Sequence, residues 1–427
     1  MRKFVLSFFF SLAVLSIIIF FTSSSSVANK GISSHLIIPE ATQNSGITNS
    51  DSTVYTPIIN TNLTATVFGY LPAWQYENAR KTIRYDLLTH IAVFDFQVSP
   101  DGGLTNPEVW PWNDVITEGH KNNVKIIMTL FSTDSTEIHQ VLTDSTAKRN
   151  IFSNIRESLI SYKLDGVNVD FETLKYSDRN VVINSFMRDL TRFLHSEMPG
   201  MEVSFAGPAV NWGGWDFKGL AEACDYIFIM GYDYFPRSSF VSGPSASLSG
   251  NMYSVESTVQ NGFFGYGEVT EAYPEKLILG VPYFGNHWIT ETGEPQSMNL
   301  QHVESVTFQS AMQFSGKFRT LWQSTYKVPW VRYQENGAWH QVWFDNQKSI
   351  GLKYDFAIAH GFKGVGMWAL GFDGNRPELW NEIKKRFYIE PPFGLSKVAS
   401  NNKNGSNNKD IFVPKALKLL ESKKGKV

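Results

Sequence analysis

Residues 164–172, LDGVNVDFE, carry the clearest structural signal in the chain. On a β-strand, side chains alternate between two faces, so Asn168, Asp170 and Glu172 share one face and three apolar side chains share the other. Burying two carboxylates and an amide is costly unless each finds a partner or has a chemical task. The stretch therefore predicts a strand that packs through one face and carries reactive groups on the other.

This stretch resembles the D-G-x-D-x-D-x-E signature of glycoside hydrolase family 18, the chitinase-like enzymes. Asp165, Gly166, Asp170 and Glu172 stand at signature positions, whereas Asn168 stands where the family usually has its middle Asp. The Asn168 pattern suits bacterial relatives. The resemblance implies an α/β fold, a (β/α)8 TIM barrel, and an enzyme that needs no metal or organic cofactor.

The rest of the chain predicts the same barrel, because short apolar runs alternate with amphipathic stretches, as in parallel βα units. Eight candidate strands lie at residues 66–71, 90–98, 124–131, 166–171, 202–206, 226–230, 277–283 and 364–368. The clearest helices lie at residues 147–162, 178–197, 349–360 and 377–387, the second with Ser177 as its N-cap. Eight such units close into a barrel whose chemistry lies at the carboxyl ends of the strands.

Motifs at other strand ends extend the resemblance. The sixth strand ends in Met230-Gly231-Tyr232-Asp233, which is similar to the family's M-x-Y-D motif, and the eighth ends in Trp368 above two glycines. The resemblance implies that Tyr232 donates its hydroxyl to the substrate, that Asp233 holds a sugar hydroxyl and that Trp368 stacks under the sugar. The other substrate-binding candidates at strand ends are Met230, Tyr70 and Tyr283.

The mechanism follows from the spacing of the two carboxylates and from the resemblance. Asp170 and Glu172, two residues apart on one strand, cannot straddle a glycosidic bond, so the nucleophile must come from elsewhere. In the family it is the sugar's own 2-acetamido oxygen. The resemblance then implies that Glu172 is the general acid and base and that Asp170 accepts the acetamido N–H, with Asp165 and Gly166 supporting the strand. We expect Asn168 to donate a hydrogen bond to Asp170 and hold it charged.

The flanking segments predict an exported protein. Residues 1–28 form a signal peptide or N-terminal anchor, and the apolar run 4–21 would associate with a membrane if it stayed uncleaved. Residues 29–64 form a flexible spacer and 65–392 the barrel, with an inserted α+β subdomain at 286–345 that contains a hairpin at Asn336 and Gly337. Residues 393–427 form a linker and a basic tail. We expect secretion or residence in the cell envelope.

Composition narrows the choice of partners. The net charge of −2 over 427 residues gives no reason to expect a nucleic acid, and the sequence shows no metal-ligand spacing. We expect a monomer, with Cys224 serving packing. The predicted activity is hydrolysis of β-linked N-acetylglucosamine-containing polysaccharide, chitin or chitooligosaccharides. The alternatives are peptidoglycan or the N-glycan core, or a non-catalytic lectin on the same barrel.

Overall fold

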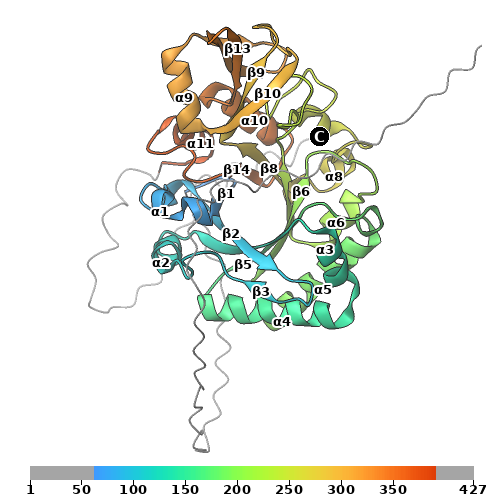
Figure 1. The fold of residues 1–427 in the computed structure, drawn as a ribbon. Coiled ribbons are helices and arrows are strands. Elements are labelled where there is room, and N and C mark those ends of the chain that lie inside the picture. Colours follow the sequence, from blue (N-terminus) through green and yellow to red (C-terminus); the bar gives the residue numbers. More distant parts are fainter. Residues whose placement is uncertain (1–61, 391–427) are drawn as a thin grey trace, which may run out of the picture. The chain divides into compact units, whose positions relative to one another are not determined.

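The computed structural model describes residues 62–390 (Figure 1). The predictions for the signal peptide or anchor, for most of the spacer, and for the linker and basic tail lie outside these residues. The last residues of the predicted spacer are already fixed, because the Thr64 N–H donates to the Phe387 carbonyl at 2.8 Å and Leu63 forms a β-bridge with Tyr388. None of the helices within residues 62–390 has the length and hydrophobicity needed to cross a membrane.

Within residues 62–390, eight parallel strands close into a barrel surrounded by helices, as Figure 1 shows. The closure is explicit, because the first strand pairs with both the second and the last. The strands are β1 (Thr66–Pro72), β2 (His90–Val98), β4 (Lys125–Ser132), β5 (Gly166–Phe171), β6 (Glu202–Pro208), β7 (Tyr226–Met230), β8 (Leu277–Pro282) and β14 (Gly364–Trp368). The two-residue strand β3 (Leu104–Thr105) pairs antiparallel with β2. The predicted TIM barrel is confirmed.

The surrounding helices differ in length, and several are a single turn or two. They are α1 (Tyr76–Ala79), α2 (Asn113–Lys121), α3 (Ser135–Thr143), α4 (Ser145–Tyr162), α5 (Val181–Glu197), α6 (Phe217–Ala223), α7 (Val255–Gln260), α8 (Gly267–Ala272), α10 (Gln347–Ala359) and α11 (Glu378–Phe387). The prediction of Ser177 as the N-cap of α5 is wrong. Ser177 lies in a short 3-10 turn and donates to the Asp178 carboxylate at 3.0 Å, and the helix starts after Asn180.

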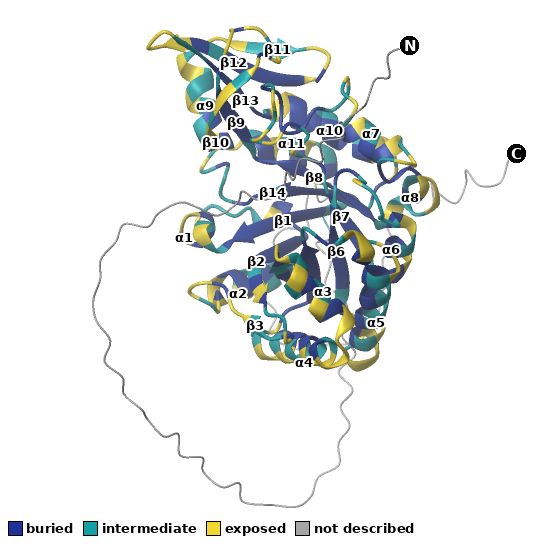
Figure 2. Cartoon of the chain, turned by 45° about the vertical axis from the view of Figure 1, so that its right-hand side comes forward, coloured by how far each residue is buried: buried dark blue, intermediate teal, exposed yellow. Residues whose placement is uncertain are grey.

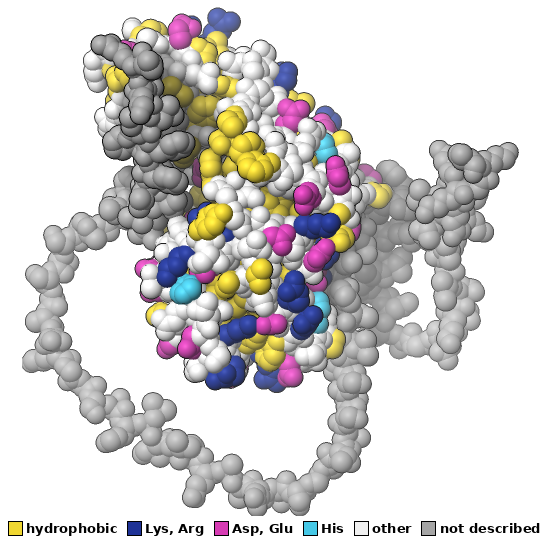
Figure 3. All heavy atoms as spheres, turned by 90° about the vertical axis from the view of Figure 1, so that its right-hand side faces the viewer, with side chains coloured by type: hydrophobic (Ala, Val, Ile, Leu, Met, Phe, Trp, Pro, Cys, Tyr) yellow, Lys and Arg dark blue, Asp and Glu magenta, His cyan; other side chains and the backbone are white. Residues whose placement is uncertain are grey.

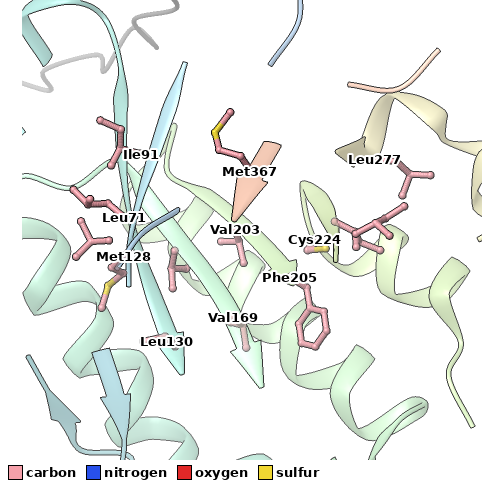
Figure 4. Close-up of a cluster of buried hydrophobic side chains, with 14 of the residues drawn as sticks. Leu71, Ile91, Met128, Leu130, Val169, Val203, Phe205, Cys224, Leu277 and Met367 are labelled. Atoms are coloured by element: carbon pink, nitrogen blue, oxygen red, sulfur yellow. The ribbon is translucent and has the colours of Figure 1, made fainter. Parts of the chain in front are cut away.

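The barrel strands are buried on both faces, and two apolar layers result (Figure 2). Outward-facing side chains such as Leu71, Val169 and Met367 pack against the helices, and Figure 4 shows part of this layer, including Cys224. Inward-facing side chains, mostly aromatic, fill the barrel. Gly166 allows close strand pairing, because a Cβ there would lie 2.4 Å from the Glu202 carbonyl oxygen.

A small antiparallel sheet follows β8, as predicted, and its strands are ordered β10-β9-β13-β12-β11. Its elements are β9 (Phe284–Thr290), β10 (Asn299–Thr307), α9 (Phe308–Lys317), β11 (Thr320–Gln323), β12 (Val328–Glu335) and β13 (Ala338–Trp343). Asn336 and Gly337 form the predicted two-residue turn between β12 and β13, and their φ angles of 51° and 78° are those of a type I′ hairpin.

Candidate active site

Four of the predicted site residues come together at the carboxyl ends of β5 and β7. Asp170 lies within β5 and Glu172 directly follows it, whereas Tyr232 and Asp233 directly follow β7. The electrostatic interactions among these groups show that they are neighbours: Asp170 acts on Tyr232, and Asp233 acts on Glu172. The charge of Glu172 also acts on Asp170, so the two carboxyl groups predicted to share one face lie close enough to interact.

Asp170 is the most deeply buried acid of this group, with 3% of its surface exposed. Its Oδ1 atom has no hydrogen-bond partner among the described residues. Loss of hydration, reinforced by the charges of Glu172 and Asp95, raises the pKa of Asp170 well above its usual range. A buried carboxyl oxygen with no partner is costly, and it is ready to accept a donor from a bound molecule.

Glu172 is poised to give up a proton near neutral pH. Loss of hydration, with repulsion from the Asp233 carboxylate as the second cause, raises the pKa of Glu172 to about 7. Asp233 itself keeps exposed surface, and its Oδ1 accepts a hydrogen bond from the Ser245 hydroxyl at 3.0 Å. A carboxyl group with such a pKa is a suitable general acid and base.

Asp95 on β2 belongs to the same electrostatic group, although it was not among the predicted site residues. Burial raises the pKa of Asp95 to about 6, although a hydrogen bond from the Gln97 amide opposes the rise. Its charge also acts on Asp170. The available signal was a single acidic residue near the carboxyl end of an otherwise apolar strand.

Asn168 does not hold Asp170, and the expected hydrogen bond between them is wrong. The Asn168 amide donates to the Ser204 hydroxyl on β6 at 2.9 Å, and its oxygen accepts from the Tyr70 hydroxyl on β1 at 2.7 Å. Asn168 is fully buried, one inward position deeper in the barrel than Asp170. Its amide therefore ties three strands together beneath the site.

Trp368 forms part of an aromatic group at the ends of β1, β2 and β14. Its ring meets Phe94 edge to face at 4.7 Å between centroids and lies 5.5 Å from Tyr70. Trp74, which is 55% exposed, lies 6.3 Å away. The ring of Phe228 fills the space left by Gly366, where a Cβ would lie 2.4 Å from its Cε2 atom, so aromatic packing supports Trp368 from below.

Two tyrosines predicted to bind substrate have other positions. Tyr283 shares the helix-facing side with Val281, is buried, and places its hydroxyl 3.3 Å from that of Tyr354 on α10. The prediction for Tyr283 is therefore wrong. Tyr70 is 1% exposed and its hydroxyl is committed to Asn168, so Tyr70 supports the site instead of forming its surface.

The remaining predicted residues support the barrel. Met230 packs against the aromatic side chains inside it. Asp165 lies at the amino end of β5, where its carboxylate accepts from the Ile126 N–H at 2.7 Å and lies 2.8 Å from His120 Nε2. Asp165 thus anchors the end of the strand opposite to Glu172. Within residues 62–390, no cluster of three or more His, Cys, Asp or Glu side chains could hold a metal ion.

Neighbouring carboxyl groups and a partly exposed tryptophan at the carboxyl end of a barrel are features expected of a glycosidase site. The sequence model described as Glycosyl hydrolases family 18 matches residues 66–373, and the chain belongs to this family. It is therefore an enzyme that acts on N-acetylglucosamine-containing substrates.

Individual relatives have low sequence identity to this chain. The cortical fragment-lytic enzyme of Bacillus anthracis is 25% identical over 325 residues, which cover 73% of this chain and 71% of the relative. The di-N-acetylchitobiase of Rattus norvegicus is 26% identical over 229 residues, or 48% of this chain and 60% of the relative. The structure of the Cycas revoluta chitinase in complex with (GlcNAc)3 is similar with a TM-score of 0.65 at 18% identity, covering 75% of this chain and 99% of that one.

Proposed function

We propose that this enzyme hydrolyses β-linked N-acetylglucosamine chains of the chitin or chitooligosaccharide type, with retention of configuration and with help from the substrate's acetamido group. The observation that supports this most directly is the pairing of a buried, unpartnered Asp170 oxygen with a neighbouring Glu172 whose pKa is about 7. Asp170 is suited to accept the acetamido N–H, and Glu172 is suited to move a proton.

In the first step the acetamido carbonyl oxygen attacks the anomeric carbon and forms a cyclic oxazolinium. The bond to the leaving oxygen breaks as Glu172 gives that oxygen its proton. Asp170 accepts the acetamido N–H, and the positive charge that develops on the oxazolinium favours the ionised form of the Asp170 carboxyl group. The Tyr232 hydroxyl donates to the acetamido oxygen. Burial keeps this hydroxyl protonated, because it raises the pKa of Tyr232 well above its usual range.

In the second step a water molecule gives a proton to Glu172 and attacks the same carbon. The bond to the acetamido oxygen breaks, and Glu172 is again protonated. Two successive inversions retain the configuration. Asp233 beside Glu172 is placed to hold a sugar hydroxyl, and the partly exposed ring of Trp368 offers a face for the sugar.

Peptidoglycan is the second candidate substrate, and the similarity to the Bacillus anthracis cortical fragment-lytic enzyme over 73% of this chain favours it. Every step above needs only one N-acetylglucosamine residue at the cleaved bond. The two candidate substrates therefore differ in the sugar on the other side of the cleaved bond.

The test is to incubate the protein with chitooligosaccharides, peptidoglycan and a high-mannose glycopeptide, and to identify the products by mass and the first-formed anomer by NMR. We expect β-anomers from at least one N-acetylglucosamine substrate. De-N-acetylated chitooligosaccharide is the control and should resist cleavage. A first-formed α-anomer, or equal cleavage of the control, would refute the mechanism.

The protein's location is a separate proposal. We infer export from the cytoplasm, because Arg2 and Lys3 precede the apolar run at residues 4–21. Deleting residues 4–21 should leave the protein in the cytoplasmic fraction of producing cells. Equal export of the deleted and full-length chains would refute this proposal.

A further inference from the structure

An exposed row of aromatic rings lies beside the carboxyl ends of β5 and β6. Trp212 is 64% exposed and Phe263 is 77% exposed, although large apolar side chains are usually buried. Ring centroids follow one another at 4.8 Å from Trp212 to Tyr253, 5.8 Å from Tyr253 to Phe264 and 4.9 Å from Phe264 to Phe263. We call these four residues the aromatic strip.

Asn211 makes several of the hydrogen bonds that fix the loop carrying Trp212. Asn211 accepts from the Gly213 N–H at 2.9 Å and donates to the Trp215 carbonyl at 3.0 Å, and its own N–H donates to the Phe264 carbonyl at 2.7 Å. Gly213 has a φ angle of 105°, which only glycine adopts readily. Trp212 is therefore presented on a fixed backbone, and binding at its ring would cost little ordering of the loop.

The strip borders the loop that follows Glu172 and β5. Tyr176 follows Glu172 by four residues, is 70% exposed, and lies against the Trp212 loop. Its Cε2 atom is 3.1 Å from the point where a Cβ on Gly214 would stand. Aromatic side chains thus lead outward from the loop after β5 to the loop after β6. Figure 3 shows the side of the molecule that lies on the right of Figure 1, where α6 and α8 are drawn, and hydrophobic side chains gather on it.

We propose that the aromatic strip binds the substrate's glycan chain beyond the sugars at the cleaved bond, with Trp212 as its main contact. This inference rests on the proposed function. A β-linked N-acetylglucosamine chain has apolar ring faces and no charge, which matches stacking on exposed rings. The nearby Arg179 donates to the Leu174 and Gly213 carbonyls at 3.0 and 3.2 Å and so helps to fix the loop that presents Trp212.

The test compares short and long substrates in Trp212→Ala and Phe263→Ala. On a chromogenic diacetylchitobioside, both variants should keep the kcat/KM of the wild type. On chitohexaose and on suspended chitin or peptidoglycan, Trp212→Ala should raise KM roughly 2- to 10-fold with kcat little changed, the range expected for one aromatic stacking contact. Trp212→Tyr should restore most of the loss. Trp322→Ala, in the five-stranded sheet, is the matched control and should behave as the wild type.

Equal effects on short and long substrates, or no effect on either, would overturn the proposal. A change in oligomeric state of Trp212→Ala, measured by sedimentation, without a change in KM would also overturn it and assign the strip to a second copy of the chain. Co-sedimentation of Glu172→Gln with chitin and peptidoglycan, with and without Trp212→Ala, measures polymer binding by the strip in the absence of hydrolysis. If adding Trp212→Ala to the Glu172→Gln protein abolishes co-sedimentation, the strip binds the polymer. This conclusion would hold even if the wild type cleaved neither polymer, because a lack of cleavage would count only against the proposed function.

Discussion

The Tyr70 hydroxyl donates a 2.7 Å hydrogen bond to the side-chain oxygen of Asn168 in the interior of the barrel. The Asn168 amide donates in turn to Ser204, so β1, β5 and β6 are joined by one chain of polar contacts. Buried polar groups need partners, and here each one supplies the next. Asn168 thus has a structural task, and the oxygen of Asp170 that lacks a partner stays available to the substrate.

Tyr70→Phe removes one hydroxyl and leaves the Asn168 oxygen buried without its donor. We expect a loss of about 1–3 kcal/mol in the free energy of unfolding, the usual cost of a buried group left unpaired. Urea unfolding followed by tryptophan fluorescence measures it. Ser204→Ala removes the other partner and should cost a similar amount. Unchanged stability of both variants would mean that the chain of polar contacts does not hold the strands together.

Asn168→Asp places a second ionisable group two residues from Asp170 on the same face. Two nearby carboxyl groups titrate together, and one of the pair has its pKa raised. We expect the variant to stay active, and we expect the acid limb of its pH–rate profile to broaden because a second ionisation enters it. Initial rates on chitooligosaccharide between pH 3 and 7, compared with the wild type, would show this. Superimposable acid limbs would contradict the prediction.

Local periodicity predicted the barrel and part of the site, and long-range contacts account for the rest. The alternation along 164–172 predicted that Asp170 and Glu172 lie together, and their charges do interact in the structure. It could not reveal that Asn168 binds Tyr70, which is 98 positions away in the sequence. Tyr283 follows Pro282, the last residue of β8. Alternation assigns the Tyr283 side chain to the inner or the outer face of the barrel, depending on which residues of β8 are taken to point inward. Asp95 lies where the register between β2 and β4 is irregular, so simple alternation does not predict its surroundings.

Glu172→Gln keeps the shape of the side chain and removes its proton. If Glu172 is the general acid, kcat on chitooligosaccharide should fall by about 10² to 10⁴, whereas the dissociation constant measured by calorimetry should change little. Asp165→Asn, at the opposite end of β5, is the control and should affect stability more than kcat. Wild-type turnover by Glu172→Gln would assign the acid to another residue.

Asp233→Asn should move the basic limb of the pH–rate profile. The limb reports the loss of the Glu172 proton, and the pKa of Glu172 is about 7 partly because the Asp233 carboxylate repels its charge. Replacing that carboxylate by an amide lowers the pKa of Glu172, so kcat/KM should begin to fall at lower pH than in the wild type. The position of the limb is the readout, because the loss of a sugar contact would lower its height alone. A limb that stayed in place or moved to higher pH would exclude this coupling.

Glu172→Gln should also change how stability depends on pH. In the unfolded chain the Glu172 carboxyl ionises near 4.5, and in the folded protein its pKa is about 7. Below pH 4.5 both the folded and the unfolded state hold the proton, so the group does not affect stability. As pH rises to 7 the unfolded state releases its proton first, which favours unfolding, and the cost is complete above pH 7. The melting temperature of Glu172→Gln relative to the wild type should therefore be nearly unchanged at pH 4 and higher at pH 8, and a difference independent of pH would show that the raised pKa of Glu172 is not a property of the folded protein.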